Sequence, residues 1–172
     1  MVKNGAFSAA ALGVLIACSP VDAAQESAPA PAQESAPSVH PESGLALIEV
    51  AVISGETRHL FTTEVAASQE AQGRGMMFRT EMGDDEAMIF PSYVPQTRSF
   101  WMKNTPLPLD IIFIGADNRI MNIGEGVPYS LDSVVSVAPA IAVFEIRGGL
   151  SEELGIAPGD LVEFELPADA SL

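Results

Sequence analysis

The chain has 172 residues, a mass of 18.0 kDa and a formal net charge of -15, with one cysteine and two histidines. This length accommodates one ordinary domain with extensions and excludes a large multidomain assembly. The acidic balance excludes general nucleic-acid binding, which requires cationic groups against phosphates, and disfavours docking on anionic lipid. Because sulfur and imidazole ligands are so few, we expect no disulfide framework, no metal and no cofactor.

Residues 1–17 have the pattern of a secretory signal peptide. Lys3 supplies the positive charge, and the apolar stretch that ends at Ala17 is too short to span a bilayer permanently. The next feature, Leu15-Ile16-Ala17-Cys18, resembles the lipobox of bacterial lipoproteins. The resemblance implies cleavage before Cys18 and acylation of this cysteine, and hence a lipid anchor in the cell envelope facing the periplasm. Ser19 favours the outer membrane, because it is not the Asp that suggests inner-membrane retention in some bacteria.

A second cleavage site competes with the lipobox. Val21-Asp22-Ala23 is an acceptable site for ordinary signal peptidase, with cleavage before Ala24. That cut would discard Cys18 and release a soluble periplasmic protein. In either case the stretch 18–43 is expected to be a disordered tether, because it is rich in Ala, Pro, Ser and Glu and repeats the sequence AQESAP.

Residues 44–172 are expected to form a single domain, with seven cations and nineteen acids. Short apolar stretches rich in β-branched residues alternate there with Gly and Pro breaks, which is typical of short strands. In chain order, we expect strands at Leu45–Ile53 and Arg58–Val65, a short helix at Ser68–Gln72, strands at Ala87–Phe90, Ser99–Lys103, Asp110–Ile114, Arg119–Ile123, Val134–Val137 and Ala140–Ile146, a helical turn at Ser151–Leu154, and a strand at Leu161–Leu166.

This pattern predicts a mainly β fold, a compact β-sandwich or barrel of short strands with one or two short helices. No alternation of strands with helices is visible, which disfavours a Rossmann-like fold. No glycine-rich phosphate-binding loop is present.

Several motifs in the domain closely resemble the domain of unknown function 192 family of bacteria and archaea. That family shows R-x-x-G-L-M-x-R, G-M-L-F, W-M-K-N-T, P-L-D-x-x-F-I, V-L-E-x-x-x-G and G-I-x-x-G-D in this order. The matching segments here are 74–79, 87–90, 101–105, 108–114, 143–149 and 155–160. Met76, Ala87 and Phe144 depart from the usual Leu, Gly and Leu, and the first arginine falls near Gln72. The resemblance implies a compact, mainly β sandwich and no established activity.

The motifs concentrate positive charge in an acidic domain, and they supply the candidate binding residues. An arginine can bind a carboxylate or phosphate with two hydrogen bonds, lysine adds a point charge, and a tryptophan face suits a sugar or aromatic ring. Amide and hydroxyl groups add donors and acceptors. The candidate binding residues are Arg74, Arg79, Trp101, Lys103, Asn104 and Thr105.

A structural interpretation of the same residues competes with binding. Arg74 or Arg79 can pair with Asp110 or Glu145 to hold loops in place, since a buried carboxylate requires a partner. Trp101 can fill the core, and the methionines of the motifs are expected to be core residues rather than metal ligands.

Catalysis has a weaker basis, and the sequence leaves open whether the protein is an enzyme. Asp110 and Glu145 are the only acids within motifs that could form a carboxylate pair for acid–base chemistry. Three functions follow: an envelope lipoprotein whose non-catalytic domain binds a small polar, anionic or saccharide-like ligand or a protein partner; a periplasmic enzyme that acts on envelope glycan; or a structural or assembly factor without a ligand.

Overall fold

The computed structural model describes residues 39–168. The expected signal peptide, Cys18, the competing cleavage site and most of the tether lie outside the described residues. The strands are β1 (Leu47–Ser54), β2 (Thr57–Val65), β3 (Glu86–Gln96), β4 (Ser99–Phe100), β5 (Leu109–Ile114), β6 (Ile120–Gly126), β7 (Val134–Val135), β8 (Ala140–Arg147) and β9 (Leu161–Phe164). The helices are α1 (Gln69–Arg74) and α2 (Leu150–Leu154).

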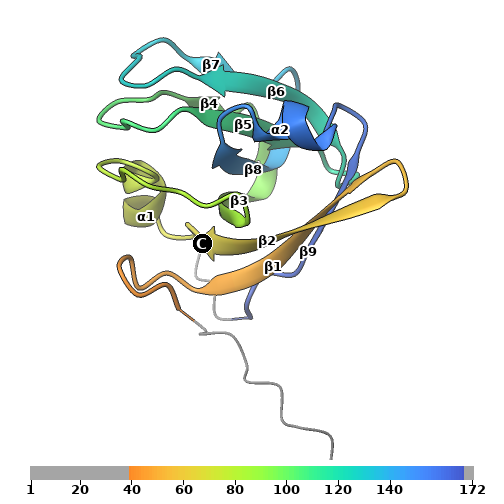
Figure 1. The fold of residues 1–172 in the computed structure, drawn as a ribbon, viewed down its shortest axis with the longest axis horizontal. Coiled ribbons are helices and arrows are strands. Elements are labelled where there is room, and N and C mark those ends of the chain that lie inside the picture. The colour runs from red at the N-terminus through yellow and green to blue at the C-terminus, as the bar shows by residue number, and fades with distance from the viewer. Residues whose placement is uncertain (1–38, 169–172) are drawn as a thin grey trace, which may run out of the picture. The chain divides into compact units, whose positions relative to one another are not determined.

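A large mixed sheet of seven strands, in the order β6-β5-β8-β3-β2-β1-β9, forms the body of the domain (Figure 1). A second sheet consists of the short strands β4 and β7. The expected mainly β fold with two short helices is therefore confirmed. The large sheet curls, and its end strands approach through one isolated bridge between Arg119 and Leu161, so the described residues do not form a closed barrel.

Alternation of side chains along the central strands creates a hydrophobic cluster on each face of the large sheet. On β5, Ile112 and Ile114 belong to one cluster, while Ile111 and Phe113 belong to the other. The first cluster joins residues from both ends of the sheet with α2, so the sheet curls around it. The second cluster lies under β4 and β7, since Phe100 and Val134 pack against it.

One feature of the topology differs from the expectation that strands do not alternate with helices. β2 and β3 are parallel neighbours, with Thr63 paired to Ala87, and the chain between them contains α1. Ser68 caps this helix by accepting a hydrogen bond from the backbone N–H of Ala71 at 3.2 Å. The crossover escaped sequence analysis because α1 has six residues, none of them buried, and so shows no helical hydrophobic periodicity.

The end of the expected tether is part of the folded structure. Val39 forms an isolated bridge with Ala46, and the chain between them turns. The hydroxyl of Ser43 donates a hydrogen bond of 2.5 Å to the carboxylate of Glu64 on β2. Among the described residues, no helix has the length and apolar character needed to cross a membrane.

Candidate functional site

Three loops that carry motif residues are joined by backbone hydrogen bonds at one end of the large sheet. The N–H of Phe78 donates to the carbonyl of Asn104 at 2.8 Å, which joins the loop after α1 to the loop after β4. The loop after β6 joins the other two. The N–H of Tyr129 donates to the carbonyl of Thr105 at 3.1 Å, and the N–H of Met102 donates to the carbonyl of Ser130 at 2.9 Å.

Left-handed backbone conformations concentrate in these three loops. Phe78, Asn104 and Tyr129 have φ values of 68°, 57° and 61°. This region suits asparagine but is unfavourable for aromatic residues, at a cost on the order of 1 kcal/mol or more each. Such strain persists only where surrounding contacts hold it, and it is commonest at functional sites.

Beneath the loops lies a small cavity of about 50 Å³. Residues from five motif segments line it, and the lining includes the aromatic side chains of Phe90 and Phe100 from the second hydrophobic cluster. Those from the motifs include Arg74, Met76, Trp101, Thr105, Leu109 and Glu145. The fold therefore gathers into one cavity residues that are far apart in the sequence.

Glu145 is the buried carboxyl group in the lining of this cavity. It lies in the middle of β8, paired with Met88 on one side and Ile111 on the other, and it is 4% exposed. No residue within 39–168 forms a hydrogen bond or ion pair with its carboxyl group. Burial raises the pKa of Glu145 to about 8. At neutral pH the carboxyl is therefore protonated and can donate one hydrogen bond as well as accept others.

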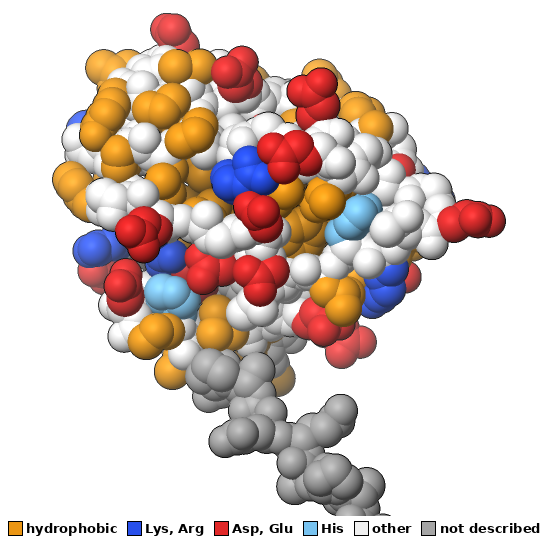
Figure 2. Space-filling model, in the orientation of Figure 1, with side chains coloured by type: hydrophobic (Ala, Val, Ile, Leu, Met, Phe, Trp, Pro, Cys, Tyr) orange, Lys and Arg blue, Asp and Glu red, His pale blue; other side chains and the backbone are white. Residues whose placement is uncertain are grey.

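Trp101 lies at the rim of the same cavity and remains 51% exposed, so it does not fill the core. The ammonium of Lys103 lies 5.2 Å from the centre of its ring, in a cation–π contact. Its indole N–H has no hydrogen-bond partner among the described residues. Phe78 and Tyr129, in the adjoining loops, are also exposed. Figure 2 shows hydrophobic side chains gathered at the upper left, over the loops near β4 and β7.

Gly75 allows the first loop to pass close to the floor of the site. A Cβ atom at this position would lie 3.3 Å from two ring atoms of Phe90, and the residue has a φ of +46°. Its N–H donates to the carbonyl of Ala71 at 2.8 Å, which ends α1. A glycine is thus required both by the turn and by the close approach.

The candidate arginines have different environments. Arg79 donates two hydrogen bonds, of 2.5 and 2.6 Å, to the buried carboxylate of Glu64. The same carboxylate accepts a hydrogen bond from the hydroxyl of Ser43. Its role is therefore to hold the loop after α1 on β2. Arg74 is exposed and has no hydrogen-bond or ion-pair partner within the described residues. Neither arginine pairs with Asp110 or Glu145, which was the partner set expected from the sequence.

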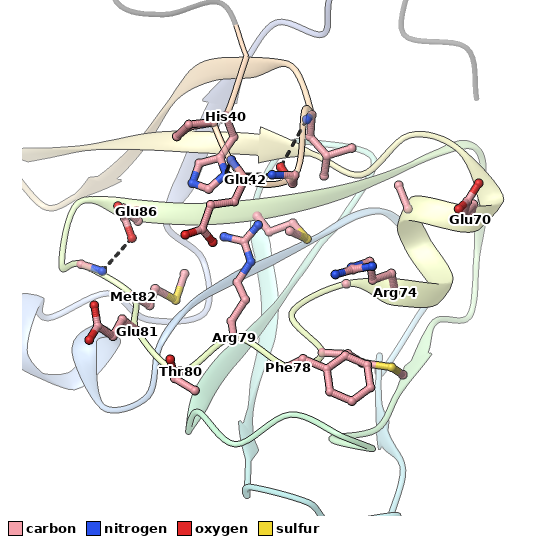
Figure 3. A pocket seen from close by; sticks show the side chains of 18 of the residues that line it. His40, Glu42, Glu70, Arg74, Phe78, Arg79, Thr80, Glu81, Met82 and Glu86 are labelled. Carbon is pink, nitrogen blue, oxygen red and sulfur yellow. Dashed lines mark hydrogen bonds between the residues drawn. The ribbon is translucent and has the colours of Figure 1, made fainter.

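A larger cavity of about 950 Å³ adjoins the small one. Its walls are residues 40–45 on one side and the stretch 74–83 on the other. Arg74, Gly75 and Met77 line both cavities, so the two are neighbouring parts of one hollow. Figure 3 shows Arg74 extending toward the middle of the larger cavity, whereas Glu70 lies at its border.

The other candidate carboxylate, Asp110, lies on the opposite face of the sheet. Residues paired across a sheet share a face, and Glu145 is paired with Ile111 whereas Asp110 is paired with Ile146. Asp110 accepts hydrogen bonds at the start of α2, from Gly149 N–H at 2.9 Å and from the N–H and hydroxyl of Ser151 at 2.8 and 2.5 Å. This arrangement caps the helix and places the two carboxyls on different sides of β5 and β8.

The two remaining candidates are backbone anchors of the site. Asn104 is exposed, and its side-chain amide nitrogen lies 4.0 Å from the sulfur of Met77. Thr105 is buried, and its hydroxyl donates a hydrogen bond to the carbonyl of Lys103. Tyr129 and Phe78 escaped sequence analysis, since neither an exposed aromatic nor a left-handed loop has a distinctive sequence pattern. Among residues 39–168, no cluster of three or more His, Cys, Asp or Glu suits a metal ion.

Comparison with known proteins places the site in a family context. The family model DUF192, described as "Uncharacterized ACR, COG1430", matches residues 50–164. The chain belongs to this family. The small cavity lies within the matched region, so its motif residues belong to the part of this DUF192 chain that the family defines.

Solved structures agree with the fold of this DUF192 domain. A protein of unknown function from Novosphingobium aromaticivorans DSM 12444 has 50% identity and a TM-score of 0.73, over 76% of this chain and 94% of that chain. A protein from Sinorhizobium meliloti 1021, described as a "putative transcription regulator", has 34% identity and a TM-score of 0.68, over 70% of this chain and 95% of that chain. No curated protein matches the chain.

Proposed function

We propose that the domain binds a small hydroxylated ring compound, such as a saccharide, at the cavity between Trp101 and Glu145. The observation that carries this proposal is the carboxyl of Glu145, which is 4% exposed, lines a cavity and lacks a partner among the described residues. An unpartnered buried polar group is costly, and a ligand that hydrogen-bonds to it offsets that cost.

The chemistry of the rim supports a ring that carries hydroxyl groups. Trp101 presents a flat apolar surface, which suits the C–H face of a sugar ring, and its free indole N–H adds a donor. The small cavity, of about 50 Å³, has room for one substituent such as a hydroxymethyl group, which would reach Glu145. The rest of the ligand would lie in the larger cavity.

The proposal has a direct spectroscopic test, because Trp101 is the only tryptophan in the chain. Titration with a panel of saccharides should change its emission, and calorimetry should give the affinities. Glu145→Leu should abolish binding at pH 7 without unfolding the domain, since leucine suits the neighbouring Met88 and Ile111. The neutral isostere Glu145→Gln should retain binding at pH 7.

The matched control is Glu125→Gln on β6, an exposed carboxylate distant in sequence from the motifs. It should bind like the wild type. If no saccharide changes the emission or releases heat, or if Glu145→Leu binds as tightly as the wild type, the proposal fails.

The geometry favours binding over hydrolysis of envelope glycan. A two-carboxylate mechanism needs both carboxyls at one cleft, about 5–10 Å apart. Asp110 lies on the other face of the sheet and caps α2. A purely structural or assembly role is also less well supported, because it does not explain an exposed tryptophan above a partnerless buried carboxyl.

We further propose that the protein is a lipoprotein of the cell envelope, anchored through Cys18 and facing the periplasm. The lipobox supports this, and the acidic tether would hold the domain away from the membrane. Labelling with palmitate should mark the wild type and not Cys18→Ser. A mature N-terminus at Ala24 would instead show that the protein is soluble in the periplasm.

A further inference from the structure

We propose that the ligand is an acidic saccharide, whose carboxylate or phosphate binds Arg74 at the junction of the two cavities. This inference rests on the proposed function and specifies the class of ligand. It starts from the partners of the cations in residues 39–168. Arg58, Arg79 and Arg147 form ion pairs with carboxylates.

Two further arginines bond to neutral oxygens. Arg98 donates to Ser92 and Gln72, and Arg119 donates to the carbonyl of Gly159. Within the described part of the chain, this leaves Arg74 and Lys103 as the cations without a polar partner. Both lie at the proposed site, Arg74 in the lining of both cavities and Lys103 over the ring of Trp101.

Arg74 does not pair with the glutamate that its own helix offers. Glu70 stands four residues before it on α1, the spacing at which a glutamate and an arginine can pair along a helix. Instead the two side chains diverge, and Arg74 extends toward the middle of the larger cavity while Glu70 stays at its border (Figure 3). The guanidinium therefore presents its donors to the space where a ligand would lie, and a planar anion fits these donors.

The acidic surroundings restrict the charge of the ligand. Glu42, Glu70 and Glu81 border the larger cavity, and they would repel further negative groups. One anionic group close to Arg74 is thus favoured over several distributed ones. Since the ring lies on Trp101 and Arg74 lines the same small cavity, the anionic group must be on the ring or on the adjoining unit.

A matched set of sugars tests the inference: glucose, glucuronic acid and glucose 6-phosphate, with Trp101 emission and calorimetry as measurements. At least one of the two acidic sugars should bind about tenfold or more tightly than glucose, in line with a charge-assisted hydrogen bond. Arg74→Gln should reduce that affinity to the level of glucose, and added salt should weaken the wild type only. The control Arg58→Gln, whose arginine is paired with Glu163 on β9, should behave as the wild type.

The outcomes separate this inference from the function on which it rests. If glucose binds as tightly as both acidic sugars, or if Arg74→Gln leaves their affinity unchanged, the acidic ligand is excluded while saccharide binding stands. If none of the three sugars binds and the wider panel is also silent, both proposals fail. A preference between glucuronic acid and glucose 6-phosphate identifies the anion as carboxylate or phosphate.

Discussion

The buried carboxyl of Glu145 makes the stability of the domain depend on pH. Its pKa is about 8 in the folded state, against an ordinary value of 4.5. Between these values the folded state holds a proton that the unfolded state has released, so stability falls as pH rises. The full stabilising contribution is present below pH 4.5 and is lost by about pH 8. A shift of this size corresponds to at most about 5 kcal/mol.

Glu145→Gln should therefore gain stability over the wild type as pH increases. Urea unfolding from pH 4.5 to 8.5 should give a difference between the two proteins that grows up to about pH 8 and then levels off. Two curves that stay parallel over this range would show that the carboxyl ionises normally.

The ionisation of Glu145 also affects the proposed binding. Above about pH 8 the carboxyl group of Glu145 loses its proton. The resulting carboxylate can no longer donate a hydrogen bond to a hydroxyl or carbonyl oxygen. The affinity of the wild type for its saccharide should fall across this pH, whereas Glu145→Gln should keep its affinity to pH 9. Calorimetric titrations at pH 6.5 and pH 9 measure the difference, and an identical fall in both proteins would assign it to another group.

Sequence reasoning named Glu145 as a catalytic candidate and Trp101 as a binding candidate, but it did not distinguish Arg74 from Arg79. Glu145 was selected because it is one of two acids that lie within the motifs, and Trp101 because it begins a motif. The partner of Arg79 is Glu64, which belongs to a strand that carries no motif. Which arginine is free depends on the neighbours that the sheet brings together, and local sequence does not record them.

Among the connecting segments, the loop after α1 depends on the pair between Arg79 and Glu64. Glu64 is 3% exposed, so removing Arg79 leaves a buried carboxylate whose remaining partners are the hydroxyl of Ser43 and the imidazole of His40, 3.8 Å away. Arg79→Met should destabilise the domain by ~3–5 kcal/mol. The control Arg58→Met removes a pair whose side chains are both 49% exposed, and it should cost less than about 1 kcal/mol. Equal losses in urea unfolding would show that burial does not set the strength of the pair.

The short helix α2 depends on Asp110 in the same way. Asp110→Asn should cost ~1–3 kcal/mol, because the carboxylate accepts three hydrogen bonds at the start of the helix. The affinity for saccharides should be unchanged once the variant is folded, since Asp110 is on the other face from the cavity. A specific loss of binding with full stability would assign Asp110 to the site instead.

Strand positions were predictable because β-branched runs bounded by Gly and Pro have a strong local signal. The expected strand at Asp110–Ile114 became β5, and that at Ala140–Ile146 became β8, each extended by one residue. The expected strand at Ala87–Phe90 is much longer in the structure, because β3 continues through Pro91 to Gln96. Proline normally interrupts a strand, and a register shift against β8 accommodates this part of the ladder.

The folded molecule as a whole begins earlier than its motifs indicate. A chain that starts at Val39 should unfold at the same temperature as the full chain, since Val39 forms the bridge with Ala46. A chain that starts at Gly44 should lose ~1–2 kcal/mol, because it lacks the bond from Ser43 to Glu64. Thermal unfolding of both chains provides the comparison, and equal stability would mean that residues 39–43 contribute nothing.

The meeting of the two end strands has a consequence for the membrane anchoring that we propose. The backbone N–H of Ile120 donates to the carbonyl of Asp160 at 2.9 Å, and that of Val162 donates to the carbonyl of Asn118 at 2.8 Å. The chain at the start of β6 therefore covers part of the free edge of β9, and the reverse. Open edges are templates for strand addition and aggregation. Anchored proteins are confined to two dimensions, where local concentrations are high. For a protein anchored as proposed, a sheet whose end strands partly cover each other's edges would limit strand addition between neighbouring copies.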